Sequence, residues 1–218
     1  RADQLQNGGI TGIVPNIWEE NRNETGACGW GDVATIIPWQ WYKTYGDPQM
    51  LEDSYQSMIK WLQYIQDRST DNLWDQSWHH GDWLHYMPIN VWDNPPAYTD
   101  KTLLAQAFYV YSLQNTIKAA EVLGKKQDAA KYTELLQVVK DKFVSEFMTP
   151  DGALMSNTQT AYVLALQFDI LPEEMRPEAA RRLVKLIGEY GNHISTGFLG
   201  TPHICHVLTR FGYEDVAY

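Results

Sequence analysis

The sequence has few of the residues that redox or metal chemistry needs. Among its 218 residues are two cysteines, Cys28 and Cys205, with no CxxC pair and no His/Cys spacing typical of a metal site. We predict that both cysteines are small buried residues rather than partners in a disulfide. We therefore expect no metal and no cofactor.

Long apolar runs and basic clusters are also missing. No stretch approaches the ~18 apolar residues of a membrane span, so we expect no contact with a membrane. The 17 basic residues are outnumbered by 27 acidic ones, which gives a net charge of −10. Since no basic patch is available to bind phosphates, the composition argues against nucleic acid and fits a neutral ligand.

Alternation of apolar and polar residues, the pattern of a half-buried strand, is also absent. The apolar spacing, with glycines and cap residues at the ends of segments, predicts an all-α fold of about seven to eight helices. We place these helices over residues 33–45, 47–66, 100–123, 127–147, 158–170, 173–190 and 201–211, with a last one beginning at 214.

The predicted helices are of two alternating kinds. The first, third and fifth contain long uncharged runs (33–42, 102–117 and 152–168), as expected for helices buried on every side. The second, fourth and sixth carry charges throughout and show one apolar stripe. This alternation predicts inner helices within a ring of outer helices, that is, part of an α/α barrel, and a superhelix of helical pairs is the alternative.

Tryptophan is concentrated in the first half of the chain. We expect Trp39, Trp41 and Trp61 to be core residues because they lie within helices, whereas Trp74, Trp78 and Trp92 either fill a long loop or face a ligand. All nine tryptophans precede residue 93: Trp18, Trp30, Trp39, Trp41, Trp61, Trp74, Trp78, Trp83 and Trp92.

The longer loops all lead into inner helices, so in a ring they would emerge on one rim, where function usually resides. They contain Gly29-Trp30-Gly31-Asp32, His79-His80-Gly81-Asp82-Trp83, Asn157-Thr158-Gln159-Thr160 and His193–Phe198. Indole rings cover the C–H face of a sugar, and Asp, Asn and His bind its hydroxyls. The structural alternative is that Asp32, Asp82, Asn157 and Thr158 only cap helices or order loops.

Several of these segments together resemble glycoside hydrolase family 78, the α-L-rhamnosidases. The resemblance extends over nearly the whole chain, and its specificity comes from the order and spacing of the segments. It is carried by Gly29-Trp30-Gly31-Asp32, Ile36-Ile37-Pro38-Trp39, Tyr45-Gly46-Asp47, Gly81-Asp82-Trp83, Asn157–Tyr162, Ala165–Phe168 and Thr196–Pro202.

The resemblance implies an (α/α)6 barrel that hydrolyses terminal α-L-rhamnosyl groups with inversion. Such enzymes use a carboxylic acid and a carboxylate base roughly 6.5–9.5 Å apart. In the family the acid precedes the segment matched by Gln6-Asn7-Gly8-Gly9, and the base follows the last helix predicted here. We therefore expect residues 1–218 to be a fragment of one catalytic domain, truncated at both ends, without a catalytic residue.

The resemblance also implies a sugar pocket. Trp30 and Trp83 match family tryptophans that line the rhamnose site, where an indole suits the C6 methyl of a 6-deoxy sugar. Asp32 and Asp82, beside them, rank next as hydroxyl acceptors or supports of the wall, and His80 follows. His203 departs from the family, which has tyrosine after Thr-Pro.

Two other functions are compatible with the residues alone. One is a different helical-barrel carbohydrate enzyme, such as a glucoamylase-like hydrolase or a phosphorylase, because one fold serves many sugars. The other is a non-catalytic helical scaffold that binds protein through an apolar face. The expected partner remains a rhamnose-containing oligosaccharide or glycoside, and the compartment stays open.

Overall fold

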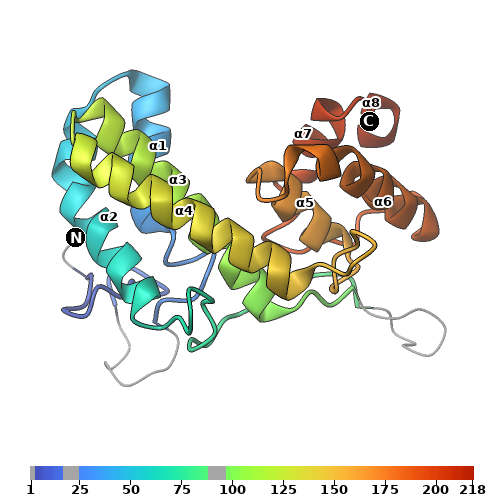
Figure 1. The fold of residues 1–218 in the computed structure, drawn as a ribbon, viewed down its shortest axis with the longest axis horizontal. Helices are drawn as coiled ribbons and strands as arrows, with labels where there is room; N and C mark the ends of the chain where they lie inside the picture. The colour runs from blue at the N-terminus through green and yellow to red at the C-terminus, as the bar shows by residue number, and fades with distance from the viewer. Residues whose placement is uncertain (1–2, 17–24, 88–96) are drawn as a thin grey trace. The chain divides into compact units, whose positions relative to one another are not determined.

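The computed structural model describes residues 3–16, 25–87 and 97–218. Within these ranges the chain is all-α: eight α-helices and one 3-10 helix, with two isolated bridges and no strand. The elements are α1 (Val33–Tyr45), α2 (Gln49–Gln66), α3 (Lys101–Val122), α4 (Lys126–Phe147), α5 (Gln159–Gln167), η1 (Glu173–Met175), α6 (Arg176–Glu189), α7 (Ile204–Arg210) and α8 (Glu214–Ala217) (Figure 1).

Local chemistry explains where these helices begin and end. Gly46 ends α1 with a left-handed φ of 69°, and its N–H bonds the carbonyl of Tyr42. The Asp47 carboxylate accepts the N–H of Gln49 at the start of α2. Thr158 caps α5 by accepting the N–H of Ala161. The cap alternative for Thr158 is thus confirmed.

The chain divides into two compact units, and the division falls inside α3 and α4. The first unit comprises residues 1–79 and 108–142. In it α1 and α2 pack as a hairpin, and the apolar stripe of α2 is buried against Ala119 and Ala120 of α3. The Tyr55 hydroxyl of α2 also donates to Asp128 of α4 at 2.9 Å.

The second unit comprises residues 80–107 and 143–218. Here α5 packs with α6 and with α7, and α7 packs with α8. The C-terminal end of α5 is held by two guanidinium groups. Arg210 donates to the carbonyl of Leu166, Arg176 donates to that of Leu171, and both pair with Asp169. Cations at a helix C-terminus satisfy carbonyls that have no partner within the helix.

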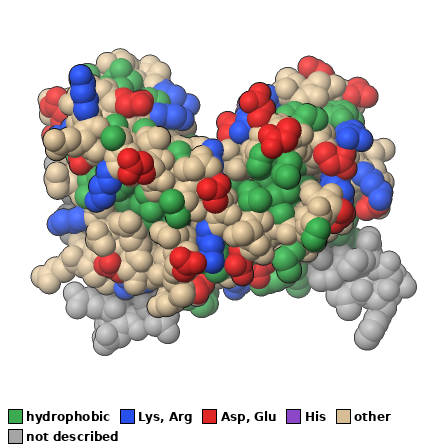
Figure 2. Space-filling view, in the orientation of Figure 1, with side chains coloured by type: hydrophobic (Ala, Val, Ile, Leu, Met, Phe, Trp, Pro, Cys, Tyr) green, Lys and Arg blue, Asp and Glu red, His purple; other side chains and the backbone are tan. Residues whose placement is uncertain are grey.

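Burial confirms part of the predicted inner and outer pattern. Every residue of α5 from Gln159 to Leu166 is buried, and α3 is buried over most of its length. Along α4 and α6, acidic and basic side chains occupy the face seen in Figure 2, as expected of helices with one wet side. In the part of the chain that the structure describes, no helix could cross a membrane.

The expectation of complete burial is wrong for α1. Val33, Ile37 and Trp41 recur every fourth residue and are 42%, 52% and 41% exposed. The helix packs through its opposite side, where Thr35 bonds Ser112 of α3 and Trp39 lies against the core. An uncharged run therefore did not ensure burial, and Trp41 is not a core residue.

The prediction that both cysteines are buried is confirmed for one of them only. Neither forms a disulfide within the described residues; Cys28 is buried as expected, but Cys205 is exposed. On the short helix α7 the buried face is made by Ile204, Val207 and Leu208. Cys205 lies on the other side, where its thiol donates weakly to the carbonyl of Ala217.

Candidate functional site

In the first unit, the segment Gly29–Asp32 is a turn organised by one buried carboxylate. Asp32 is fully buried and accepts three hydrogen bonds. One carboxylate oxygen accepts the Ser112 hydroxyl at 2.5 Å and the Trp61 indole N–H at 3.1 Å. The other accepts the backbone N–H of Gly29 at 2.8 Å. Asp32 thereby ties the turn to α2 and α3.

Close packing accounts for the glycine before Asp32. A Cβ on Gly31 would lie 2.2 Å from the Trp61 ring, so only glycine lets the turn rest on that indole. Trp61 is itself fully buried, as predicted. Trp30, between the two glycines, is half-buried and is the side chain that this turn leaves partly open to solvent.

His79 anchors the same turn from the following loop. Its Nδ1 accepts the N–H of Cys28 at 3.0 Å, so a neutral His79 ring carries its proton on Nε2. The ring meets the edge of Trp74, which is fully buried. Of the three loop tryptophans, Trp74 fills the loop, Trp78 is 45% exposed, and Trp92 lies outside the described residues.

Burial also affects the ionisation of Asp32. Desolvation raises the pKa of Asp32 to about 6, although the hydrogen bonds from Ser112, Gly29 and Trp61 act in the opposite direction. Removal from water disfavours the charged carboxylate more than these donors favour it. The group is therefore placed to hold the turn, with no surface open to a ligand.

In the second unit, Asp82 joins two loops. It is 3% exposed. Its Oδ2 accepts the N–H of Gly197 at 2.7 Å and the hydroxyl of Thr160, and its Oδ1 accepts the N–H groups of Leu199 at 2.7 Å and Gly200 at 3.4 Å. A carboxylate has about four acceptor positions. All of them are used within the protein.

The two loops approach so closely that one position requires glycine. A Cβ on Gly197 would lie 2.4 Å from the carbonyl oxygen of Trp83 and 2.5 Å from that of Asp82. The N–H of Phe198 also donates to the carbonyl of Trp83 at 2.7 Å. The Asp82 loop and the 196–200 loop consequently form one ordered surface.

Three aromatic rings lie on that surface. Trp83 stacks with His80 at a centroid distance of 6.1 Å and with Phe198 at 6.3 Å, with interplanar angles of 20° and 28°. Trp83 and Phe198 are 53% and 60% exposed. An exposed indole on a loop fixed by a buried carboxylate is the arrangement expected of a ligand-facing wall rather than of core packing.

The five predicted site residues thus fall into two groups by geometry. Trp30, Trp83 and His80 have surface to offer a ligand. Asp32 and Asp82 have none, which favours wall support over hydroxyl binding, the two roles that the sequence left open. Phe198 was predicted only as part of a loop segment and not as a site residue. An aromatic residue that follows glycine in a long loop is the signal that could have identified it as one.

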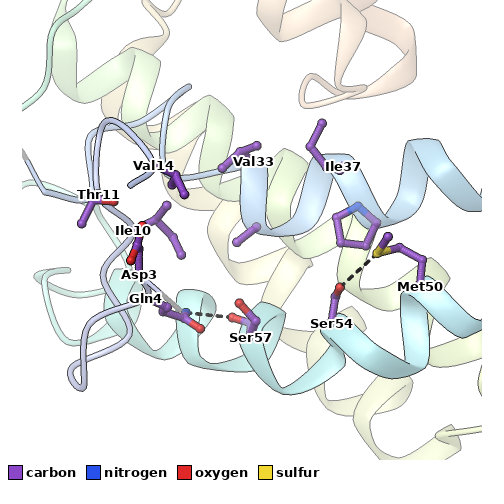
Figure 3. A pocket seen from close by; sticks show the side chains of 12 residues that line it. Asp3, Gln4, Ile10, Thr11, Val14, Val33, Ile37, Met50, Ser54 and Ser57 are labelled. Carbon is purple, nitrogen blue, oxygen red and sulfur yellow. Dashed lines mark hydrogen bonds between the residues drawn. The ribbon is translucent and has the colours of Figure 1, made fainter. Parts of the chain in front are cut away.

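Of the hollows among the described residues, two lie next to the segments described above. The first, of about 360 Å³, lies between α1, α2 and the N-terminal segment, and includes Val33, Ile37 and Ser54 (Figure 3). None of the predicted site residues lines it. The second, of about 350 Å³, lies in the second unit beside Phe198 and Thr196. Among the described residues no group of three His, Cys, Asp or Glu side chains is placed to hold a metal ion.

The helical hairpins and the exposed aromatic rings on carboxylate-ordered loops fit the class of helical-barrel carbohydrate enzymes. Comparison with known families specifies the class further. All of residues 1–218 match the model of the bacterial alpha-L-rhamnosidase 6 hairpin glycosidase domain. The chain belongs to this family, and its all-α hairpins are part of the family's six-hairpin (α/α)6 fold.

Individual relatives agree with this membership. An alpha-L-rhamnosidase of Formosa agariphila is 40% identical over 220 residues, and one of Streptomyces avermitilis is 38% identical over 218 residues. Both alignments cover the whole of this chain. They cover only 23% and 20% of the relatives, so this chain spans about a fifth to a quarter of their length.

Solved structures give the same result. The Streptomyces avermitilis alpha-L-rhamnosidase complexed with L-rhamnose superposes with a TM-score of 0.90 at 37% identity, over all of this chain and 20% of that one. The native enzyme from Aspergillus terreus superposes with a TM-score of 0.89 at 30% identity, over all of this chain and 25% of that one.

Replacing Asp32 by Asn tests the effect of burying this carboxylate. Because its folded-state pKa of about 6 lies above the usual 3.8, the folded state binds the proton more tightly. The contribution of Asp32 to the free energy of unfolding should therefore fall by about 3 kcal/mol as the pH rises from about 4 to 6. We expect the difference between the parent chain and Asp32→Asn, measured by urea unfolding, to follow that fall and level off above pH 7. A difference independent of pH would contradict it.

Replacing Asp82 by Asn tests its part in holding the two loops together. One oxygen becomes an NH2 group that faces backbone donors, so local opening should become easier by about 2–4 kcal/mol. We expect hydrogen exchange at the amides of Gly197 and Leu199 to accelerate at least about 30-fold.

Asp141→Asn is the matched control for this measurement. Asp141 is exposed and accepts one bond from the Gln137 side chain. Its replacement should leave exchange in the 196–200 loop unchanged. Full protection of Gly197 and Leu199 in Asp82→Asn would show that the carboxylate does not order this loop.

Proposed function

We propose that this chain is the middle part of the catalytic domain of an α-L-rhamnosidase, and that it supplies walls of the pocket for the terminal rhamnose. The substrate would be a rhamnose-containing oligosaccharide or glycoside. Hydrolysis would proceed with inversion, as the resemblance to glycoside hydrolase family 78 implies. The chain's own part in this reaction is to bind and orient the sugar.

The observation that carries this proposal is the exposed ring of Trp83, which stacks with His80 and with Phe198 on a loop fixed by Asp82. An indole held in this way covers the C–H face of a sugar, and it suits rhamnose because the C6 position is a methyl group rather than a hydroxymethyl group. In the first unit, Trp30 is held by the Asp32 turn, and the family resemblance makes it a further candidate for contact with rhamnose.

The relatives support the choice of sugar. The matched curated proteins of Streptomyces avermitilis and Formosa agariphila are named alpha-L-rhamnosidases, and one matched structure contains L-rhamnose. A helical barrel alone would fit a glucoamylase-like hydrolase or a phosphorylase equally well. The identity of these relatives therefore favours rhamnose over glucose.

The roles of the remaining site residues follow from their burial. We assign Asp32 and Asp82 to holding Trp30 and Trp83 in place, because their oxygens are used by protein donors. His80 would support the Trp83 ring from one side. The general acid and general base would come from segments outside residues 1–218.

Trp83→Ala in the enzyme that contains this chain should weaken rhamnose binding. Removing the ring removes the apolar surface over the sugar, so we expect the dissociation constant for rhamnose to rise at least about tenfold. Because the side chain is half exposed and its backbone carbonyl still binds Phe198, the fold should persist. Isothermal titration and circular dichroism measure the two effects.

Trp41→Ala is the matched control, since it removes an indole of similar exposure from a helix rather than a loop. Its rhamnose affinity should equal that of the parent enzyme. Unchanged affinity in Trp83→Ala would refute the pocket assignment. Faster turnover of an aryl glucoside than of an aryl rhamnoside by the parent enzyme would refute the choice of sugar.

The 218-residue chain by itself should hydrolyse no aryl α-L-rhamnoside. Inverting hydrolysis needs both carboxyl groups, one to protonate the leaving oxygen and one to activate water. We expect release of the aryl alcohol to equal the buffer blank at every pH from 4 to 8. Turnover above the blank that co-purifies with the folded chain would place a catalytic residue within it.

A further inference from the structure

The turn that carries Trp30 is held through its backbone N–H groups. Those of Trp30 and Gly31 both donate to the carbonyl of Ala27, at 3.2 and 2.8 Å, as is usual within a tight turn. The two N–H groups before them, at positions 28 and 29, donate to side chains instead. The acceptors of these two bonds therefore help to decide how the indole of Trp30 is presented.

One of the two acceptors belongs to the turn, and the other reaches it from a distant loop. Asp32 accepts the N–H of Gly29 from within the turn at 2.8 Å. His79 accepts the N–H of Cys28 at 3.0 Å, across 51 positions of the sequence. Because a backbone N–H can only donate, Nδ1 of His79 must offer its lone pair. His79, which is buried, thus fixes the turn from outside it.

Aromatic contacts hold the ring of His79 in place. It lies perpendicular to the fully buried ring of Trp74, with the centroids 4.8 Å apart. The indole N–H of Trp74 donates to Ser77 at 2.9 Å, and its ring meets that of Trp61 edge-on at 5.7 Å. Trp61 in turn donates to Asp32. These contacts close a circuit that begins and ends at the turn, so both of its side-chain acceptors are held by buried indole groups.

We infer that His79 is a positioning residue for Trp30, acting through the N–H of Cys28 to fix the indole proposed to contact the sugar. The inference rests on the proposed function, in which Trp30 contacts rhamnose. A wall that is ordered before binding favours affinity, since ordering the turn on binding would cost free energy. His80, the next residue, stacks on Trp83. The two adjacent histidines would thus each orient one tryptophan, one in the first unit and one in the second.

A purely structural histidine is the alternative, in which the ring only fills space against Trp74. Two substitutions separate the alternatives. His79→Phe keeps a flat ring against Trp74 but has no acceptor for the N–H of Cys28. His79→Asn keeps a side-chain oxygen near the place of Nδ1 but loses the ring. Positioning requires the acceptor, whereas space filling requires the ring.

Hydrogen exchange in the enzyme that contains this chain measures how firmly the turn is held. The amide of Cys28 should exchange at least about tenfold faster in His79→Phe, because a buried N–H loses this acceptor. In His79→Asn its exchange should stay within about threefold of the parent enzyme. His206→Phe, the same substitution at an exposed histidine of α7, is the matched control and should leave this amide unchanged.

Isothermal titration with L-rhamnose measures the consequence for binding. We expect the dissociation constant to rise about fivefold or more in His79→Phe and to stay within about twofold in His79→Asn. In a Trp30→Ala background, His79→Phe should weaken binding no further, because the indole that it positions is gone. A histidine that only stabilised the fold would show no such dependence on Trp30. Circular dichroism checks that each variant is folded.

The outcomes separate this inference from the proposed function. If Trp30→Ala weakens rhamnose binding but His79→Phe does not, or if His79→Asn weakens it as much as His79→Phe, the positioning role is refuted and the pocket stands. Should His79→Phe fail to fold, folded His79→Asn decides alone: parent-like affinity supports the role, and weakened affinity overturns it. If Trp30→Ala leaves the affinity unchanged, the proposed contact of Trp30 with rhamnose fails, and the positioning role fails with it.

Discussion

A buried carboxylate that accepts backbone N–H groups is the interaction on which the candidate site depends. Asp82 accepts three backbone N–H groups from residues 197–200, and these bonds fix the 196–200 loop against the loop that contains Asp82. Charge-assisted bonds of this kind are roughly twice as strong as neutral ones, and burial strengthens them further. Aromatic rings on such a surface keep a defined orientation even though they are exposed to water.

The same arrangement recurs in the first unit with different donors. Asp32 receives one backbone N–H, an indole N–H and a hydroxyl, and its turn rests on the Trp61 ring through Gly31. In both units the acidic residue of a Gly/Trp/Asp motif is hidden, while a tryptophan of the motif keeps exposed surface. In each motif the carboxylate therefore orders the loop, and the indole keeps the exposed surface that we propose for contact with a ligand.

This division of roles differs from the one that the Trp/Asp pairs suggest in the sequence. Trp and Asp side by side suggest a sugar site in which the ring stacks and the carboxylate binds hydroxyls. Here Asp32 and Asp82 are buried and accept bonds from the protein, so the exposed side chains of the Asp82 surface are mainly the rings of Trp83 and Phe198. That property agrees with a 6-deoxy sugar and with the apolar hollow beside Phe198.

The sequence by itself determined the helices, their caps and the family, because these depend on local spacing and on motifs close together in the chain. The stripe of α2, the stop at Gly46 and the burial of α5 were all predictable. Only the tertiary structure decided that Asp82 meets residue 197 across 115 positions, that Ser112 bonds Asp32, and that Leu84 adopts a positive φ. It also left one side of α1 exposed, since burial depends on which neighbours a helix meets rather than on its own composition.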